Sequence, residues 1–244
     1  MLPEQYLIAL VILLSAYFIR GITGFGSGLI AIPLLAHFLP LSFVVPMMLA
    51  VDFLASVALS QARMQVRWDE VKSLIPSSAI GMLIGAPMLI SLPHEPLLIG
   101  LAVFVMIFGV RYLFNIHGEN PVSRWWSIPT GLSGGAIGAM FGTGGPPYVI
   151  YLSHRLHDKT QLRGTLSGLF MLEGAMRIIV FLFIGLLTQP DMLASILLAI
   201  PVMAAGLWLG QRVHMGISRP QQLAIIGVLL IISGGSLLAR VWLQ

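Results

Sequence analysis

Hydrophobic residues run through this chain in eight long segments that are separated by short polar stretches. The segments cover residues of about 5–39, 43–61, 73–92, 96–114, 125–152, 165–187, 191–210 and 221–243. Six of them are close to the ~20 apolar residues that a helix needs to cross a bilayer. The first and the fifth are longer, and clusters of glycine interrupt both. The pattern therefore predicts an all-α polytopic membrane protein in which two segments contain a break.

The order of motifs in the first half of the chain recurs in the second half. Three pairs of stretches match in the same order: GFGSG (24–28) with GTGGP (142–146), IPSSAIGMLIG (75–85) with IPVMAAGLWLG (200–210), and LLIG (97–100) with AIIG (224–227). We assign the glycines spaced four apart in the middle pair to close helix packing. The matches predict one integral membrane domain made of two repeats, residues 1–120 and 121–244.

Lysine and arginine occur in only some of the loops. They follow segments two, four, five and seven, and none follows segments one, three or six. If every segment crossed once, these basic loops would lie on opposite sides in the two halves, against the positive-inside rule. If segments one and five return to the side they entered, all basic loops face the cytoplasm and each half has three crossings. The charges therefore favour two inverted repeats, with the first segment of each repeat broken or re-entrant at its Gly-rich stretch and both termini outside.

Composition agrees with a membrane protein and excludes several classes of function. The chain is 57% hydrophobic and 9% charged, whereas soluble domains are roughly 25% charged. It has no cysteine, which excludes disulfides, thiolate metal sites and cysteine nucleophiles. A net charge of +4 is too small and too scattered for a nucleic-acid surface. No Lys or Arg precedes the first apolar stretch, so we expect residues 1–20 to stay in the mature protein rather than act as a signal peptide.

The two matched breaks predict a substrate site near the middle of the membrane. Irregular backbone inside a bilayer is tolerated only where it faces protein or a watery cavity, and matched breaks in inverted repeats are typical of transporter sites. A helix start after each break would offer free N–H groups to an anion, and Pro146 and Pro147 suit a first helical turn. Close helix packing is the alternative role for these glycines. The candidate substrate-binding residues at the breaks are Arg20, Thr23, Gly24, Gly26, Ser27, Gly28, Gly142, Thr143, Gly144 and Gly145.

Four ionisable residues lie inside apolar segments, namely Arg20, Asp52, Glu173 and Arg177. Each costs roughly 2.5–3.5 kcal/mol at the bilayer centre, so we expect them to face the protein interior. Glu173 and Arg177 are spaced i,i+4. They form either a structural ion pair or an anion site in which Arg177 binds substrate and Glu173 holds it or exchanges a proton. Arg20 either complements a helix C-terminus or contacts the anion, and Asp52 either pairs with an arginine or binds a coupling ion.

Two long stretches carry a family resemblance. FIRGITGFGSGLIAIPLL and GGAIGAMFGTGGPPYVIYL, with the two Pro-x4-Gly-x3-Gly helices, resemble the sulfite exporter TauE/SafE family of secondary permeases over nearly the whole chain. The resemblance implies an inner-membrane carrier of small sulfur anions such as sulfite, thiosulfate or organosulfonates. GTGGPP departs from the commoner glycine triplet followed by one proline, and Ser27 stands where glycine is common. Both changes border the predicted site, which favours a substrate other than the best-known ones.

We therefore predict a secondary transporter (permease) that moves a small sulfur-containing anion across the cytoplasmic membrane by alternating access. An anion channel and a carrier of a small non-sulfur carboxylate stay open as alternatives. No nucleophile–base pair or metal cluster is visible in the sequence, so we expect no enzyme activity, cofactor or metal. The expected partners are the anion and the lipid bilayer, with a second copy of the chain as a candidate partner and no nucleic acid. The expected location is the inner cell membrane, with several crossings and cytoplasmic basic loops.

Overall fold

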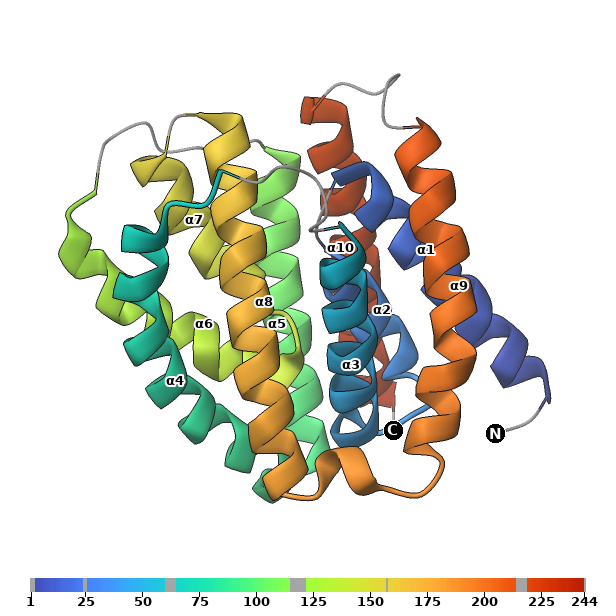
Figure 1. Ribbon diagram of the computed structural model, residues 1–244. Coiled ribbons are helices and arrows are strands. Elements are labelled where there is room, and N and C mark those ends of the chain that lie inside the picture. Colours follow the sequence, from blue (N-terminus) through green and yellow to red (C-terminus); the bar gives the residue numbers. More distant parts are fainter. Residues whose placement is uncertain are drawn as a thin grey trace. The chain divides into compact units, whose positions relative to one another are not determined.

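Helices are the only regular secondary structure in the part of the chain that the structure describes (Figure 1). This computed structural model describes residues 3–23, 26–59, 65–114, 122–156, 158–213 and 219–243. The α-helices are α1 (Pro3–Thr23), α2 (Ser27–Leu35), α3 (Leu41–Leu59), α4 (Trp68–Ser91), α5 (His94–Leu113), α6 (Ser127–Phe141), α7 (Gly145–Arg155), α8 (Lys159–Phe183), α9 (Met192–Val213) and α10 (Arg219–Leu243). Two short 3-10 helices are η1 (Arg124–Trp126) and η2 (Leu186–Thr188). The predicted all-α class is confirmed.

Six described helices are long and apolar enough to cross a membrane, and they are α1, α3, α4, α5, α8 and α9. The described apolar part of α10, Ile226–Trp242, is shorter. The sequence also predicted six crossings, but it left α1 outside and included α10, a helix of 25 residues whose crossing stays a prediction. The difference arises because α1 continues for 21 residues before the break, which is long enough to span the bilayer by itself.

Both predicted breaks are present. The first separates α1 from α2, and the second separates α6 from α7. Gly26, with φ 96°, and Gly142, with φ 67°, have the left-handed backbone that glycine adopts without strain. The helices after the breaks have 9 residues in α2 and 11 in α7. At ~1.5 Å per residue, neither is long enough to cross a hydrocarbon core of ~30 Å.

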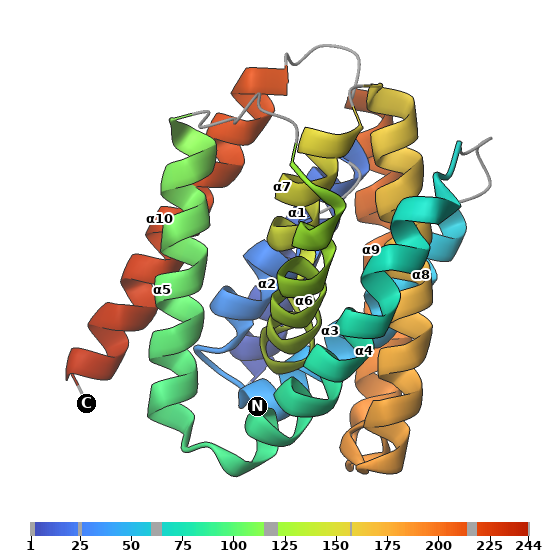
Figure 2. The same cartoon turned by 90° about the vertical axis from the view of Figure 1, so that its left-hand side faces the viewer.

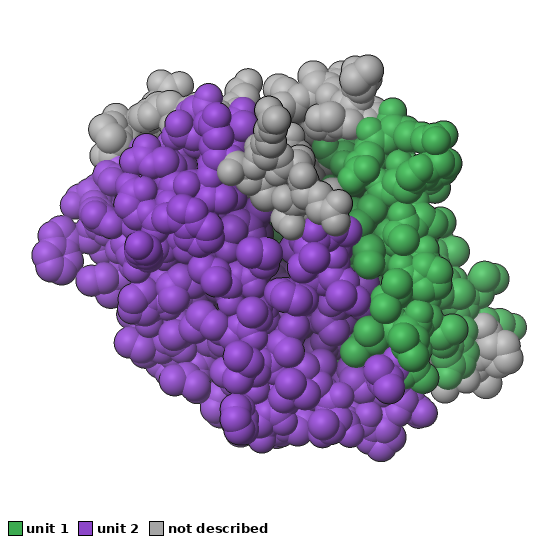
Figure 3. All heavy atoms as spheres, viewed as in Figure 1, with its two compact units in different colours: residues 1–44, 92–117, 194–244 green, residues 45–91, 118–193 purple. Residues whose placement is uncertain are grey.

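The helices pack into two compact units, which Figure 3 shows in different colours. Unit 1 consists of Met1–Val44, Leu92–His117 and Ala194–Gln244, and unit 2 of Val45–Ser91 and Gly118–Leu193. Unit 1 contains the α1–α2 break with α5, α9 and α10, and unit 2 contains the α6–α7 break with α4, α8 and most of α3. Each unit thus takes helices from both halves of the chain. The two sequence repeats stay a prediction, because these units do not follow the boundary between the halves.

The helices with glycines spaced four apart pack against the half-helices that precede the breaks. In unit 2, α4 crosses α6 (Figure 2), and a Cβ atom at Gly85 would overlap the backbone of Ala136. In unit 1, a Cβ atom at Gly210 of α9 would overlap the backbone of Phe18 in α1. The first glycine of each motif, Gly81 or Gly206, also lies close to the backbone of the neighbouring helix. The packing role predicted for these glycines is confirmed, and each half-helix is held by a helix from the other half of the chain.

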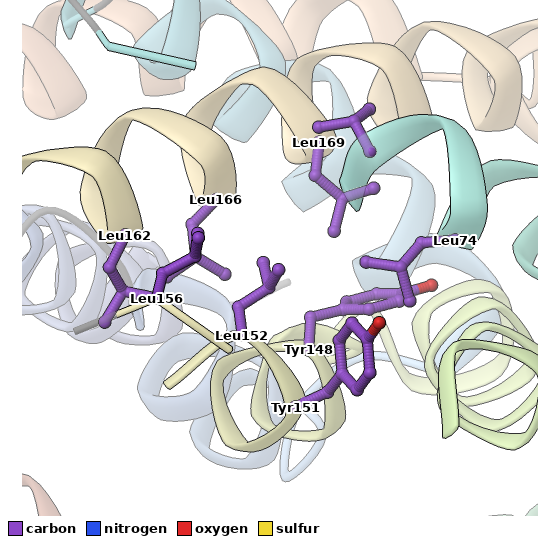
Figure 4. Packing of buried hydrophobic residues seen from close by; sticks show 9 residues of the cluster. Leu74, Tyr148, Tyr151, Leu152, Leu156, Leu162, Leu166 and Leu169 are labelled. Carbon is purple, nitrogen blue, oxygen red and sulfur yellow. The ribbon is translucent and has the colours of Figure 1, made fainter. Parts of the chain in front are cut away.

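The hydrophobic core of unit 2 joins α7 to α4 and α8. Figure 4 shows Leu152 of α7 facing the leucines of α8. Tyr148, also of α7, lies beside Leu74 of α4 at the other end of the cluster. The buried members are Val71, Leu74, Tyr148, Tyr151, Leu152, Leu156, Leu162, Leu166 and Leu169. This core fixes α7 against α8, the helix that carries Glu173 and Arg177.

The basic loops of unit 2 meet at one end of the unit. Arg155, the last residue of α7, donates from Nε and Nη2 to the buried Glu70 of α4, at 3.1 and 2.7 Å, and from Nη1 to the carbonyl of Val122 at 3.3 Å. The hydrogen bonds to Glu70 raise the pKa of the Arg155 guanidinium, which stays charged. Arg124 donates to the carbonyl of Asp69 at 2.7 Å. The α6–α7 pair therefore starts and ends at the same end of unit 2, as a re-entrant hairpin does.

Candidate functional site

A buried arginine lies against the last turn of α6. The side chain of Arg177, on α8, packs over Gly138, where a Cβ atom would come within 3.0 Å of Arg177 Cζ. The carbonyl of Gly138 accepts the N–H of Gly142 at 2.9 Å. The guanidinium is therefore about one helical turn from the break in unit 2.

Glu173 is the buried acid of this region, at 2% exposure. Its Oε2 lies 3.6 Å from Arg177 Nη2, an ion pair longer than a hydrogen bond. Its Oε1 accepts hydrogen bonds from the hydroxyls of Ser78 on α4 and Tyr148 on α7, and these two hydroxyl oxygens lie 2.9 Å apart. The predicted i,i+4 pair is present, and two hydroxyls that the sequence did not single out surround its carboxylate.

Two buried polar atoms near this break have no hydrogen-bond partner within the residues described. They are Arg177 Nε and Thr143 Oγ1, and Thr143 is 3% exposed. A buried donor without a partner costs about 1–3 kcal/mol, so proteins keep one mainly where water, an ion or a ligand completes its bonding. An anion with several oxygens carries acceptors of the kind that both atoms need.

The two helix starts after the breaks differ in the backbone donors that they offer. α7 begins at Gly145, and Pro146 and Pro147 follow it, so two of its first residues have no N–H. α2 begins at Ser27 and has no proline in its first turn. Every residue in the first turn of α2 thus has a backbone N–H, whereas two residues in the first turn of α7 lack one.

In unit 1, the buried arginine belongs to the broken helix itself. Arg20 lies in the last turn of α1, and its Nη1 donates to Ser27 Oγ at the start of α2, at 3.0 Å. This hydrogen bond crosses the break and joins the two half-helices. Gly26 precedes α2, and Gly28 is buried in its first turn. Outside the described part of the chain lie Gly24 and the side chain of Thr23.

Asp52 lies on α3 and is partly buried. Its backbone carbonyl accepts a hydrogen bond from the hydroxyl of Ser56 at 2.8 Å. Its two predicted roles, pairing with an arginine or binding a coupling ion, stay predictions. Among the described residues, no group of three or more His, Asp or Glu side chains could hold a metal ion.

The structure places the predicted site residues in two groups. Unit 2 contains Gly142, Thr143, Gly144, Gly145, Glu173 and Arg177, and unit 1 contains Arg20, Gly26, Ser27 and Gly28. Sequence reasoning missed Gly138, Ser78 and Tyr148. Ser78 lies inside the motif assigned to packing, and Tyr148 directly follows the two prolines. Neither position carries a sequence signal for its contact with Glu173.

Comparisons with known proteins agree with this picture. A family model described as sulfite exporter TauE/SafE matches residues 8–237. The chain belongs to this family. A relative from Comamonas testosteroni, described as probable inner membrane transporter protein TsaS, is 30% identical over 182 residues, which cover 73% of this chain and 75% of the relative. No solved structure matches the chain significantly. Membership in the TauE/SafE family, together with the apolar helices, makes this chain a multi-pass membrane transporter.

Proposed function

We propose that this TauE/SafE protein is a secondary transporter that moves a small sulfur-containing anion across the cytoplasmic membrane. The observation that carries the proposal is the buried guanidinium of Arg177 at a helix break, with a donor atom that lacks a partner among the described residues. A charge inside a bilayer costs roughly 2.5–3.5 kcal/mol, so we expect a cation kept there to serve an ion. The family description supports a sulfur oxyanion as that ion.

The predicted repeats support an anion contact at each break. Matching Gly24 with Gly142 shifts the numbering by 118 (142 minus 24), so the counterpart of Arg20 is position 138 (20 plus 118). That position is Gly138, and the guanidinium of Arg177 packs on it. Each broken pair of helices thus has one guanidinium at the corresponding turn, although the two come from different elements.

The donors of unit 2 suit an anion with several oxygens. A guanidinium binds two oxygens side by side through its planar fork. The hydroxyl of Thr143 and the N–H of Gly145 would then bind the remaining oxygen of a sulfite or sulfonate group. In unit 1, the N–H groups at the start of α2 are the corresponding donors, and Ser27 orients Arg20.

The proposed mechanism is alternating access by two inverted repeats with eight segments. The hairpin contacts of α6 and α7, which begin and end among basic loops, support a re-entrant element, and the positive-inside rule places those loops in the cytoplasm. We propose the inverted arrangement for α1 and α2, which would begin and end on the outer side. An anion channel is the competing function, and the homodimer stays a prediction.

Anion flux in proteoliposomes that contain the purified full chain tests this function. We expect saturable uptake and counterflow of one anion among sulfite, thiosulfate and an alkylsulfonate, with acetate excluded. Flux that rises without saturation would indicate a channel, and uptake of acetate alone would indicate a carboxylate carrier. No flux of any anion, from protein shown to be folded and inserted, would contradict the proposal.

We expect Gly138→Ala to impair transport far more than stability. The added methyl group overlaps the guanidinium of Arg177, which ends a flexible side chain and can move aside while the helices stay in place. Loss of hydrogen bonds to a charged group costs about 1.5–3 kcal/mol, so uptake below saturation should fall roughly 10–100-fold. Gly235→Ala is the matched control, because a Cβ atom there has no neighbour within 4 Å. Equal uptake by both variants would show that the position of Arg177 does not matter.

A further inference from the structure

The carboxylate of Glu173 is surrounded by groups from several helices of unit 2. Ser78 of α4 and Tyr148 of α7 donate to it, and Arg177 of α8 supplies the positive charge. On α3, the apolar Phe53 packs against Gly174, the residue that follows Glu173. On α6, Gly138 lies beneath the guanidinium of Arg177. Among the groups that the structure places around this carboxylate, Arg177 is therefore the one that balances its charge.

The two carboxylate oxygens of Glu173 have different surroundings. Oε1 already accepts two hydroxyl donors, whereas Oε2 faces the guanidinium of Arg177 at 3.6 Å. If Arg177 turns to a bound anion, Oε2 loses its positive neighbour, and the hydroxyls of Ser78 and Tyr148 still donate to Oε1. Oε2 is then the oxygen that can take up a proton.

Charge balance inside the membrane decides whether Glu173 is ionised or protonated after an anion has bound. Without an anion, the charges of Glu173 and Arg177 cancel. With a monovalent anion on Arg177 and Glu173 still ionised, the buried group would carry a net charge of minus one, which burial disfavours. Protonation of Glu173 restores neutrality.

We propose that Glu173 takes up one proton when a monovalent anion binds to Arg177, so that the protein carries an anion and a proton together without net charge. The proton comes from the water on the side where the anion enters. It is held on Oε2 of Glu173 and leaves with the anion on the other side. This coupling rests on the proposed function of Arg177 as the anion contact.

The wild-type protein tests the coupling directly. Proteoliposomes that contain a pH dye receive an inward gradient of an alkylsulfonate, which stays ionised and so cannot carry the proton itself. We expect internal acidification of one proton per sulfonate and a rate that does not depend on an imposed membrane potential. Sulfonate counterflow without proton movement would overturn the coupling and leave the proposed function intact, whereas absence of any anion flux would overturn both.

The variant Glu173→Gln tests the assigned residue. Glutamine keeps an oxygen that can accept from Ser78 and Tyr148 but cannot take up a proton. We expect slower counterflow than in the wild type, no acidification, and loss of the roughly tenfold sulfonate accumulation that a tenfold proton gradient drives in the wild type. Glu70→Gln, which changes the buried acid paired with Arg155, is the matched control and should still acidify. Acidification by Glu173→Gln would overturn the assignment.

A second variant keeps the test decisive if Glu173→Gln does not fold. Tyr148→Phe removes one of the two hydroxyl donors to Oε1 and leaves the ring in the hydrophobic core. The pH profile of sulfonate uptake should move to higher pH, because the ionised carboxylate loses a hydrogen bond. A profile identical to that of the wild type would contradict the role of Glu173.

Discussion

Replacing Arg177 by glutamine is expected to abolish anion transport. The variant removes the buried guanidinium at the break in unit 2 and with it the planar fork that we propose to bind two anion oxygens. Each of the two hydrogen bonds of this fork to a charged group would contribute about 1.5–3 kcal/mol, so losing both should lower uptake below saturation at least roughly 100-fold. Arg177→Lys keeps the charge without the fork and should retain a small part of the activity. Initial uptake rates in proteoliposomes measure both variants.

Misfolding must be separated from loss of the site in this experiment. Without Arg177, the carboxylate of Glu173 is buried without a positive partner, and breaking a buried pair in this way costs about 3–5 kcal/mol. The double variant Glu173→Gln with Arg177→Gln removes both charges and should melt close to the wild type. We expect it to stay inactive. Transport by the folded double variant would show that Arg177 has only a structural role.

The second large effect is expected from Gly85→Ala, which should destabilise the protein severely. A Cβ atom at Gly85 would lie 2.8 Å from Cα and 2.9 Å from the carbonyl carbon of Ala136. Both are backbone atoms, so no side chain can move aside and α4 must separate from α6. Overpacking costs typically about 1–3 kcal/mol, and we expect the upper end here. At 2–4 °C for each kcal/mol, the apparent melting temperature should fall by roughly 6–12 °C.

Melting in detergent and elution by size-exclusion chromatography measure this effect. Gly235→Ala again serves as the control, since alanine there meets open space and should leave the melting temperature unchanged or slightly higher. Transport by Gly85→Ala should fall as well, because α4 carries Ser78 and α6 carries Gly138. A melting temperature equal to that of the control would mean that α4 and α6 are not in close contact.

Several features could be predicted from local sequence alone. The apolar segments follow from the length and composition that a bilayer demands of a helix, and the two breaks follow from clustered glycines within such segments. The pairing of Glu173 with Arg177 follows from the helical period. The close-packing role of Gly85 and Gly210 follows from their spacing, since small residues four apart form one face of a helix.

Other features could not be predicted, because they depend on which helices meet. The span formed by α1 was not predicted, because the exact end of the helix before the break decides its length. The role of Gly138 as the surface beneath Arg177 carries no local signal, because a glycine in a Gly-rich helix fits many contacts. Pro146 and Pro147 were correctly expected in a first turn, yet their lack of N–H groups leaves the start of α7 with fewer backbone donors than the start of α2.

The sequence by itself determined that this protein is an apolar, all-α membrane protein with two glycine breaks and buried charges. These properties follow from rules that act within one segment, namely length, hydropathy and the freedom of glycine. Only the tertiary structure decided that α4 packs on α6 and brings Ser78 to Glu173, 95 residues away in the chain. The physical reason is that such contacts depend on how closely two helix backbones approach, and no pattern within either helix specifies its partner.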